Sequence, residues 1–250
     1  MAARNKTRTN KEAGKHQEDK ASKHPFFSSN EQENASGIRN NKVAILICLV
    51  ILLLFAGIFT AYRFFITPER LTIDQLHERN LKGKLDPEEG YTYRGFSFVR
   101  ANNMWFTKIA RTGTSDIYNL QFHYGPREVE NITVLGDVKS FLRYNETFIT
   151  FNPSEKRLSY TALTSGEITI NLASVLGILP HAACTKNETR GCSTAAIVNC
   201  ESTSAPVLSL EITPDPKIIT EKNCLRIQGN GTDLLRSADK TLLQWFGIMD

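Results

Sequence analysis

The chain has 250 residues, of which 41% are hydrophobic and 22% charged, and its formal net charge is +4. Residues 1–42 hold nine Lys or Arg against five Asp or Glu, and this excess of four equals the whole net charge. The 187 residues from Phe64 balance 20 basic against 21 acidic residues, which argues against a nucleic-acid-binding surface there.

The first 42 residues predict a disordered basic tail. They are rich in Lys, Asn, Glu, Gln and Ser, and their only apolar cluster is Pro25–Phe27. Such a composition buries too little apolar surface to offset the entropy lost on ordering. The tail could attract anionic lipid or nucleic acid. However, acidic residues such as Glu12 and Asp19 interrupt its basic series, and we favour a solvated tail with a role in topology.

An uncharged run of nineteen residues, Val43–Ala61, predicts a transmembrane helix. A helix of this length rises about 28 Å, close to the roughly 30 Å of bilayer hydrocarbon. The run is longer than the apolar part of a cleaved signal peptide and begins later. A soluble core helix, the alternative, is rarely apolar all round. We therefore expect an uncleaved signal anchor at 43–62 that contacts the lipid bilayer.

The orientation of this helix is inferred from the tail rather than from the immediate flanks. Two basic residues lie near each end of the apolar run, whereas the tail as a whole is positively charged. Basic tails remain in the cytoplasm. We therefore expect a cytoplasmic N-terminus and an extracytoplasmic domain at 63–250, attached to the cell membrane by a single pass.

The outer segment begins with a helix and an antiparallel meander. Thr72 opens a capping-box pattern and predicts a short helix that ends near Gly83. Aromatic residues then alternate with polar ones, and a turn at Asn102–Asn103 predicts a hairpin over 91–111. A third strand is expected at 117–124, where alternate side chains are apolar or aromatic.

The second half of this segment mixes strands and helices. Apolar runs predict strands at 148–151, 207–212 and 223–228. Residues 158–179 fit either a strand or a helical face, and their length favours a helix. The last helix is capped by Thr232 and carries one apolar stripe. The fold class is α+β, a mostly antiparallel sheet with packed helices, preceded by one transmembrane helix.

Four of the five cysteines lie within 41 residues of the outer segment, at Cys184, Cys192, Cys200 and Cys224. An even number of cysteines in an oxidising compartment favours two disulfides, which would hold the segment 184–224. Zinc binding and a redox dithiol are the alternatives, but the closely spaced C-x2-C pairs typical of both are absent. Three connectivities fit the sequence, which does not choose among them.

Four N-x-[ST] sequons in the outer segment are candidate glycosylation sites. They are Asn131, Asn145, Asn187 and Asn230. Asn187 lies between two cysteines in a polar stretch that would tolerate a glycan. We therefore expect the outer domain to be a glycoprotein.

Motifs for catalysis or cofactor binding are weak or missing. Gly229–Gly231 precedes a predicted helix, but Leu234 replaces the third glycine of G-x-G-x-x-G, which favours a tight turn over a phosphate loop. The sequence has no H-E-x-x-H or G-x-S-x-G motif. The densest polar group is His123 with Arg127 and Glu128, where we favour a sheet-edge histidine over a general base. No metal or cofactor site is predicted.

The strings HYGPREVENI, ACTKNETRGC and CLRIQGNGTDLLRSADK are spread over about half of the chain. They resemble a group of uncharacterised archaeal single-pass proteins with a cysteine-bearing outer domain and a terminal amphipathic helix. The resemblance implies an extracytoplasmic archaeal setting, in which disulfides and N-glycans form, and it implies no activity.

Two functions fit these observations. We favour a binding or assembly module at the cell surface, whose partners would be envelope proteins, glycans or a second copy. The alternative is a membrane-tethered hydrolase or transferase whose site forms only in the fold, with His123 and Glu128 as candidate residues. A concave pocket with converging titratable groups would favour the enzyme, whereas a smooth sheet or an exposed apolar patch would favour binding.

Overall fold

A computed structural model describes residues 36–65, 71–110, 116–156 and 158–250 of the chain. The chain divides into two compact units, Met1–Glu69 and Arg70–Asp250. Most of the predicted tail, residues 1–35, lies outside the described residues.

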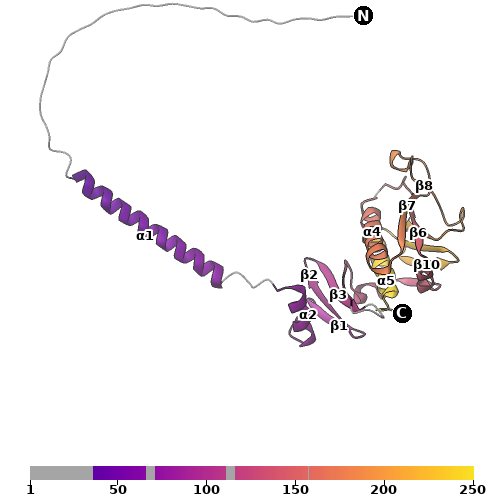
Figure 1. Cartoon of the computed structure of the whole chain (residues 1–250), viewed down its shortest axis with the longest axis horizontal. Helices are drawn as coiled ribbons and strands as arrows, with labels where there is room; N and C mark the ends of the chain where they lie inside the picture. The colour runs from indigo at the N-terminus through magenta and orange to yellow at the C-terminus, as the bar shows by residue number, and fades with distance from the viewer. Residues whose placement is uncertain (1–35, 66–70, 111–115, 157) are drawn as a thin grey trace, which may run out of the picture. The chain divides into compact units, whose positions relative to one another are not determined.

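The described part of the first unit is one helix, α1 (Ser36–Phe65) (Figure 1). Its segment Asn41–Arg63 is long and apolar enough to cross a membrane, with a mean hydropathy of 3.1. None of this apolar segment is buried against protein, as expected of a helix that contacts lipid. The helix also includes 36–42, which the sequence assigns to the tail, because no proline interrupts its hydrogen bonds there.

The second unit begins with α2 (Ile73–Leu81), and the predicted capping box is present. The Gln75 backbone N–H donates to Thr72 Oγ1 at 3.3 Å, and the Thr72 N–H donates to Gln75 Oε1 at 2.8 Å. A four-stranded antiparallel sheet follows, in the order β1-β2-β3-β4. Its strands are β1 (Gly90–Tyr93), β2 (Phe96–Ala101), β3 (Met104–Ala110) and β4 (Ile117–Phe122).

This sheet confirms the predicted meander and adds one turn to it. Asn102 and Asn103 both have positive φ angles, as the predicted turn between β2 and β3 requires. A second turn at Arg94–Gly95, also with positive φ at both residues, divides the first half of the predicted hairpin into β1 and β2. The third predicted strand, β4, ends two residues earlier than expected, at Phe122.

The second sheet has seven strands in the order β5-β10-β11-β9-β6-β7-β8. They are β5 (Thr133–Leu135), β6 (Glu146–Phe151), β7 (Leu179–Cys184), β8 (Ala196–Ile197), β9 (Val207–Ile212), β10 (Lys217–Glu221) and β11 (Cys224–Gly229). Only β10 and β11 pair antiparallel, and the other neighbours run parallel. The expectation of a mostly antiparallel sheet is therefore correct for the first sheet and wrong for the second. The reason is that β6 and β7 are joined through a helix, a connection that makes strands parallel.

Short helical segments connect the two sheets and the strands within them. They are α3 (Pro126–Val129) and the 3₁₀ helices Val138–Arg143 and Arg190–Cys192.

Two longer helices pack against each other, and the second of them lies against the second sheet. Helix α4 (Leu158–Asn171) continues into one turn of π-helix, Leu172–Leu176, and ends at Gly177 with a φ of +70°. This confirms the helix favoured for the ambiguous segment, whose last residue, Leu179, instead begins β7. The predicted cap of helix α5 (Thr232–Trp245) is wrong by one residue, because Gly231 is the N-cap and Thr232 is already the first helical residue.

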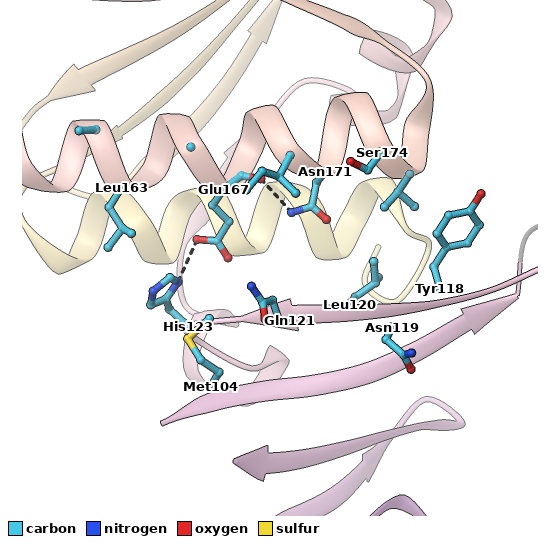
Figure 2. A pocket seen from close by; sticks show the side chains of 14 residues that line it. Met104, Tyr118, Asn119, Leu120, Gln121, His123, Leu163, Glu167, Asn171 and Ser174 are labelled. Atoms are coloured by element: carbon cyan, nitrogen blue, oxygen red, sulfur yellow. Dashed lines mark hydrogen bonds and ion pairs between the residues drawn. The ribbon is translucent and has the colours of Figure 1, made fainter. Parts of the chain in front are cut away.

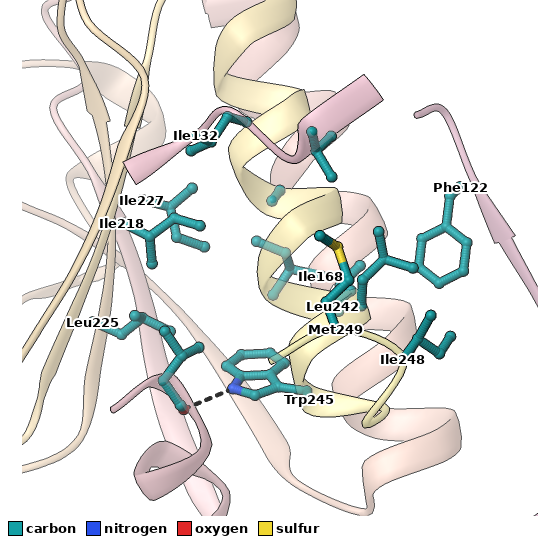
Figure 3. Close-up of a cluster of buried hydrophobic side chains, with 14 of the residues drawn as sticks. Phe122, Ile132, Ile168, Ile218, Leu225, Ile227, Leu242, Trp245, Ile248 and Met249 are labelled. Atoms are coloured by element: carbon teal, nitrogen blue, oxygen red, sulfur yellow. Dashed lines mark hydrogen bonds between the residues drawn. The ribbon is translucent and has the colours of Figure 1, made fainter. Parts of the chain in front are cut away.

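Helix α5 is at the centre of the core. Figure 3 shows Ile218, Leu225 and Ile227 of the seven-stranded sheet pointing toward it, with Phe122 of β4 at its other side. Because α5 packs against the seven-stranded sheet on one side and against Phe122 on the other, eleven of its residues are buried, including the polar Asp239 and Lys240. The predicted apolar stripe is therefore only one part of a helix that is buried nearly all round.

Candidate functional site

His123 directly follows β4 and faces α4 (Figure 2). Its Nδ1 lies 3.0 Å from Oε2 of Glu167, which projects from the middle of α4. The His123 side chain is 28% exposed and the Glu167 side chain 8%. The pair therefore joins the end of the antiparallel sheet to α4 and keeps the imidazole accessible.

Asp239 of α5 lies next to this pair. Its side chain is fully buried, and its Oδ2 accepts a hydrogen bond from the Tyr124 backbone N–H at 2.7 Å. Burial, followed by the neighbouring Glu167 carboxylate, raises the pKa of Asp239 above its ordinary value. One ligand atom each from His123, Glu167 and Asp239 lies within 4.8 Å of the other two.

Each of the two carboxyl groups also has a buried oxygen without a hydrogen-bond donor. These atoms are Glu167 Oε1 and Asp239 Oδ1. Buried polar atoms are normally paired, and two buried carboxylates in contact repel each other. The cluster therefore needs either a shared proton or a bound cation.

His123 and Glu167 also line a groove of about 540 Å³ between the β3–β4 edge and α4. Figure 2 shows its side chains lying between the helix and the two strands. Its apolar lining includes Met104, Leu120, Leu163, Ile170 and Val175. Its other polar lining residues are Tyr118, Asn119, Gln121, Asn171 and Ser174. The groove thus offers an apolar surface with a titratable pair.

Arg127 and Glu128, predicted to join His123, have other partners. Glu128 Oε2 accepts hydrogen bonds from Trp105 Nε1 at 2.6 Å and from the Gly125 N–H at 2.7 Å. The Arg127 guanidinium lies 3.9 Å from the centre of the Tyr91 ring. Both side chains therefore hold α3 against the antiparallel sheet, and the residues of the predicted polar group are divided between two places.

Sequence reasoning missed Glu167 and Asp239, although each left a signal. Glu167 is the only charged residue in the stretch 158–179, and Asp239 adjoins Ala238 of the apolar stripe. An isolated charge in an apolar segment often marks a buried interaction. The sequence does not show that these two residues meet His123, because they are 44 and 116 residues away along the chain.

The four outer cysteines form two disulfides, Cys184–Cys192 and Cys200–Cys224. This pairing selects one of the three connectivities left open by the sequence. All four sequon asparagines, Asn131, Asn145, Asn187 and Asn230, are exposed. Their glycosylation stays a prediction.

The Gly229–Gly231 segment forms a turn into α5. A Cβ atom on Gly229 would lie 2.5 Å from the Leu234 backbone nitrogen, so close approach of the helix requires glycine there. Close packing of α5 therefore explains why residue 229 is a glycine, and no phosphate ligand is needed to explain it.

Comparison with known proteins gives no match, whether to a family model, to a curated protein or to a solved structure. The resemblance to archaeal single-pass proteins therefore stays a prediction.

Proposed function

We propose that the chain is a single-pass membrane protein whose outer domain is a binding module at the cell surface. In this proposal the groove between β4 and α4 holds a small amphipathic ligand. The span Asn41–Arg63 and the two disulfides support a membrane-attached domain in an oxidising compartment. The basic tail supports an inward N-terminus.

The groove is the observation that carries the proposal. Its volume of about 540 Å³ lies within the roughly 300–1,000 Å³ of small-molecule sites. Leu163 is 44% exposed and Ile170 63%, so these lining side chains leave apolar surface uncovered. Burial of that surface under a ligand would be favourable by roughly 25 cal/mol per Å².

The polar lining indicates the chemistry of the ligand. Glu167 contributes an acidic group, and Asn119, Gln121 and Asn171 contribute amides, whereas Lys and Arg are missing from the described part of the lining. This composition favours a neutral or cationic polar group, such as a hydroxyl or an amine, over a phosphate or carboxylate. Binding of an envelope protein or a glycan elsewhere on the domain remains a separate expectation from the sequence.

Unfolding of the outer domain provides a direct test. Both tryptophans of the chain, Trp105 and Trp245, are buried in this domain, so their fluorescence reports its unfolding. The full chain in lipid nanodiscs is heated with matched panels of neutral, cationic and anionic amphipathic compounds. We expect neutral or cationic members to raise the melting temperature, because ligands that bind only the native state stabilise it.

Two substitutions of equal exposure make the test specific. Ile170 lines the groove and is 63% exposed, whereas Ile117 of β4 is 64% exposed and does not line it. Ile170→Asn should abolish the ligand-induced shift, and Ile117→Asn should retain it. Equal shifts in the two variants, or a response to the anionic panel alone, would refute the proposed site.

The hydrolase or transferase alternative is supported by one observation, the convergence of His123 and Glu167 in a concave groove. With Glu167 ionised, the hydrogen lies on Nδ1 and leaves Nε2 of His123 as a base. Ser174, which lines the groove from the π-helical turn after α4, carries a hydroxyl about two helical turns from Glu167, roughly 10 Å along the axis. Because no lining nucleophile adjoins the base within the described groove, binding ranks first. If the parent chain hydrolyses a chromogenic ester and His123→Ala abolishes that activity, the enzyme would rank above the binding module.

A further inference from the structure

The contact of His123, Glu167 and Asp239 brings together one imidazole and two carboxyl groups from three separate elements. The groups come from the end of β4, the middle of α4 and the middle of α5. Imidazole nitrogen and carboxylate oxygen are ligands typical of divalent transition metals. A bound cation, like a shared proton, would relieve the repulsion between two buried carboxylates.

We propose that His123, Glu167 and Asp239 form a binding site for one divalent transition-metal ion of the zinc type. The proposal goes beyond the groove ligand and does not depend on it. Two buried carboxylate oxygens, Glu167 Oε1 and Asp239 Oδ1, have no donor in the described structure and are free to bind an ion. Its positive charge would offset the repulsion between the two carboxylates.

The distances fit such an ion. Ligands held at about 2.1 Å around a tetrahedral ion lie about 3.4 Å apart. One ligand atom each of His123, Glu167 and Asp239 lies within 4.8 Å of the other two, and the Glu167 carboxylate is already 3.0 Å from His123 Nδ1 through Oε2. Closing the ligand separations from at most 4.8 Å to about 3.4 Å requires each side chain to move by about 1 Å or less.

A backbone hydrogen bond orients the Asp239 ligand. The Tyr124 N–H donates to Asp239 Oδ2, which leaves Oδ1 for the ion. Such outer partners fix a ligand and raise metal affinity. His123 and Glu167 line the groove, whereas Asp239 lies behind them, so the remaining coordination positions would face the groove. An ion there would be reachable by water or by a groove ligand.

The second His–Glu pair of the domain provides a matched control. His181 Nε2 lies 3.1 Å from Glu146 Oε2, close to the spacing in the proposed site. This pair is 39% and 64% exposed and belongs to no three-residue cluster in the described chain. His181→Gln therefore removes an equivalent imidazole without affecting the proposed ligands.

The experiment measures zinc binding to the full chain in nanodiscs, without reductant, in a Cys48→Ala background that lacks the free thiol. The protein is stripped with EDTA, desalted and titrated with Zn²⁺ against a chromogenic chelator. We expect one ion per chain, an affinity at least about tenfold lower in both His123→Gln and Glu167→Gln, and unchanged binding in His181→Gln. Mg²⁺, which prefers oxygen ligands, should compete poorly.

The choice of variants keeps the result decisive. Asp239→Asn would also change the partner of the Tyr124 N–H, so the test relies on His123→Gln and Glu167→Gln. Tryptophan fluorescence shows whether these two variants are folded. Ile170→Asn should retain zinc even if the groove ligand is lost, which separates this site from the proposed function. A parent chain that binds no Zn²⁺ would overturn the proposal, and the shared proton would then account for the cluster. Equal zinc affinity in His123→Gln, Glu167→Gln and the parent would overturn it as well.

Discussion

Gly125 lies where the antiparallel sheet meets α3. Its φ of −79° is ordinary, so the backbone itself does not require glycine. A Cβ atom there would lie only 2.2 Å from Tyr91 Oη and 3.4 Å from the Trp105 ring. Tyr91 is held by Trp105 and by the Arg127 guanidinium and has little room to move. We expect Gly125→Ala to lower the free energy of unfolding by about 1–3 kcal/mol, measured by urea titration of tryptophan fluorescence.

Gly191→Ala is the control for this substitution. A Cβ atom on Gly191 would meet nothing within 4 Å, and its φ is not left-handed. The change in unfolding free energy should stay within about 0.5 kcal/mol. If Gly125→Ala were as stable as Gly191→Ala, the close contact with Tyr91 would not limit this position.

His77 of α2 should make stability depend on pH. Burial, and then the charge of Lys108, lowers the pKa of His77, while Asp74 opposes them. Protonation therefore favours the unfolded chain. The contribution of His77 is fully present above its unfolded pKa of about 6.5 and is lost as the pH falls through the lowered folded pKa. Melting temperatures measured between pH 8 and pH 5 should fall more steeply for the parent than for His77→Asn, and parallel curves would contradict this.

At the scale of elements, the two disulfides differ in the length of chain that they close. Cys200–Cys224 spans 24 residues and Cys184–Cys192 spans 8. The chain-entropy model gives stabilisation of about 3.5 and 2.6 kcal/mol, respectively. The small cluster of Ala183, Val198 and Val207 supplies little other core in this region.

The difference between the two loops can be measured with paired alanine variants. Cys200→Ala/Cys224→Ala should lose about 1 kcal/mol more unfolding free energy than Cys184→Ala/Cys192→Ala. Urea titration of both variants without reductant gives this comparison. A larger loss from the shorter loop would indicate that local packing, rather than loop closure, dominates.

Elements were predictable from the sequence where a local pattern decides them. The capping box at Thr72, the alternation in β4 and the apolar run of β9 are such patterns. In contrast, β7 was missed because its Pro180 and alanines give no alternation, and β5 has only three residues. The parallel pairing of the second sheet depends on crossovers between distant segments, which no local periodicity records.

The candidate site shows the same limit. The sequence predicted His123 at a strand end, but it paired this residue with its chain neighbours, Arg127 and Glu128. The fold instead supplies Glu167 and Asp239 from two helices. Only packing of α4 and α5 against the antiparallel sheet brings the three groups together. The acidic partners of His123 are therefore set by tertiary packing and not by the local sequence.

At the scale of the whole molecule, the apolar span and the disulfides favour the same topology, with the N-terminal tail inside the cell and the second unit outside. The span is uncharged between Val43 and Ala61, whereas the outer segment is almost electrically balanced. The charge that could select an orientation is therefore in the N-terminal tail. Disulfides independently favour an oxidising exterior for the second unit.

Cysteine labelling in intact cells tests this orientation. Lys139 is exposed and distant in sequence from the disulfides, and Lys11 lies in the tail. In a Cys48→Ala background, a membrane-impermeant maleimide should label Lys139→Cys in intact cells and Lys11→Cys only after permeabilisation. The parent Cys48→Ala chain, whose other cysteines are paired, is the unlabelled control. The reverse pattern would place the disulfide-bonded domain in the cytoplasm, where reducing thiols oppose disulfides, and the cell-surface proposal would then be wrong.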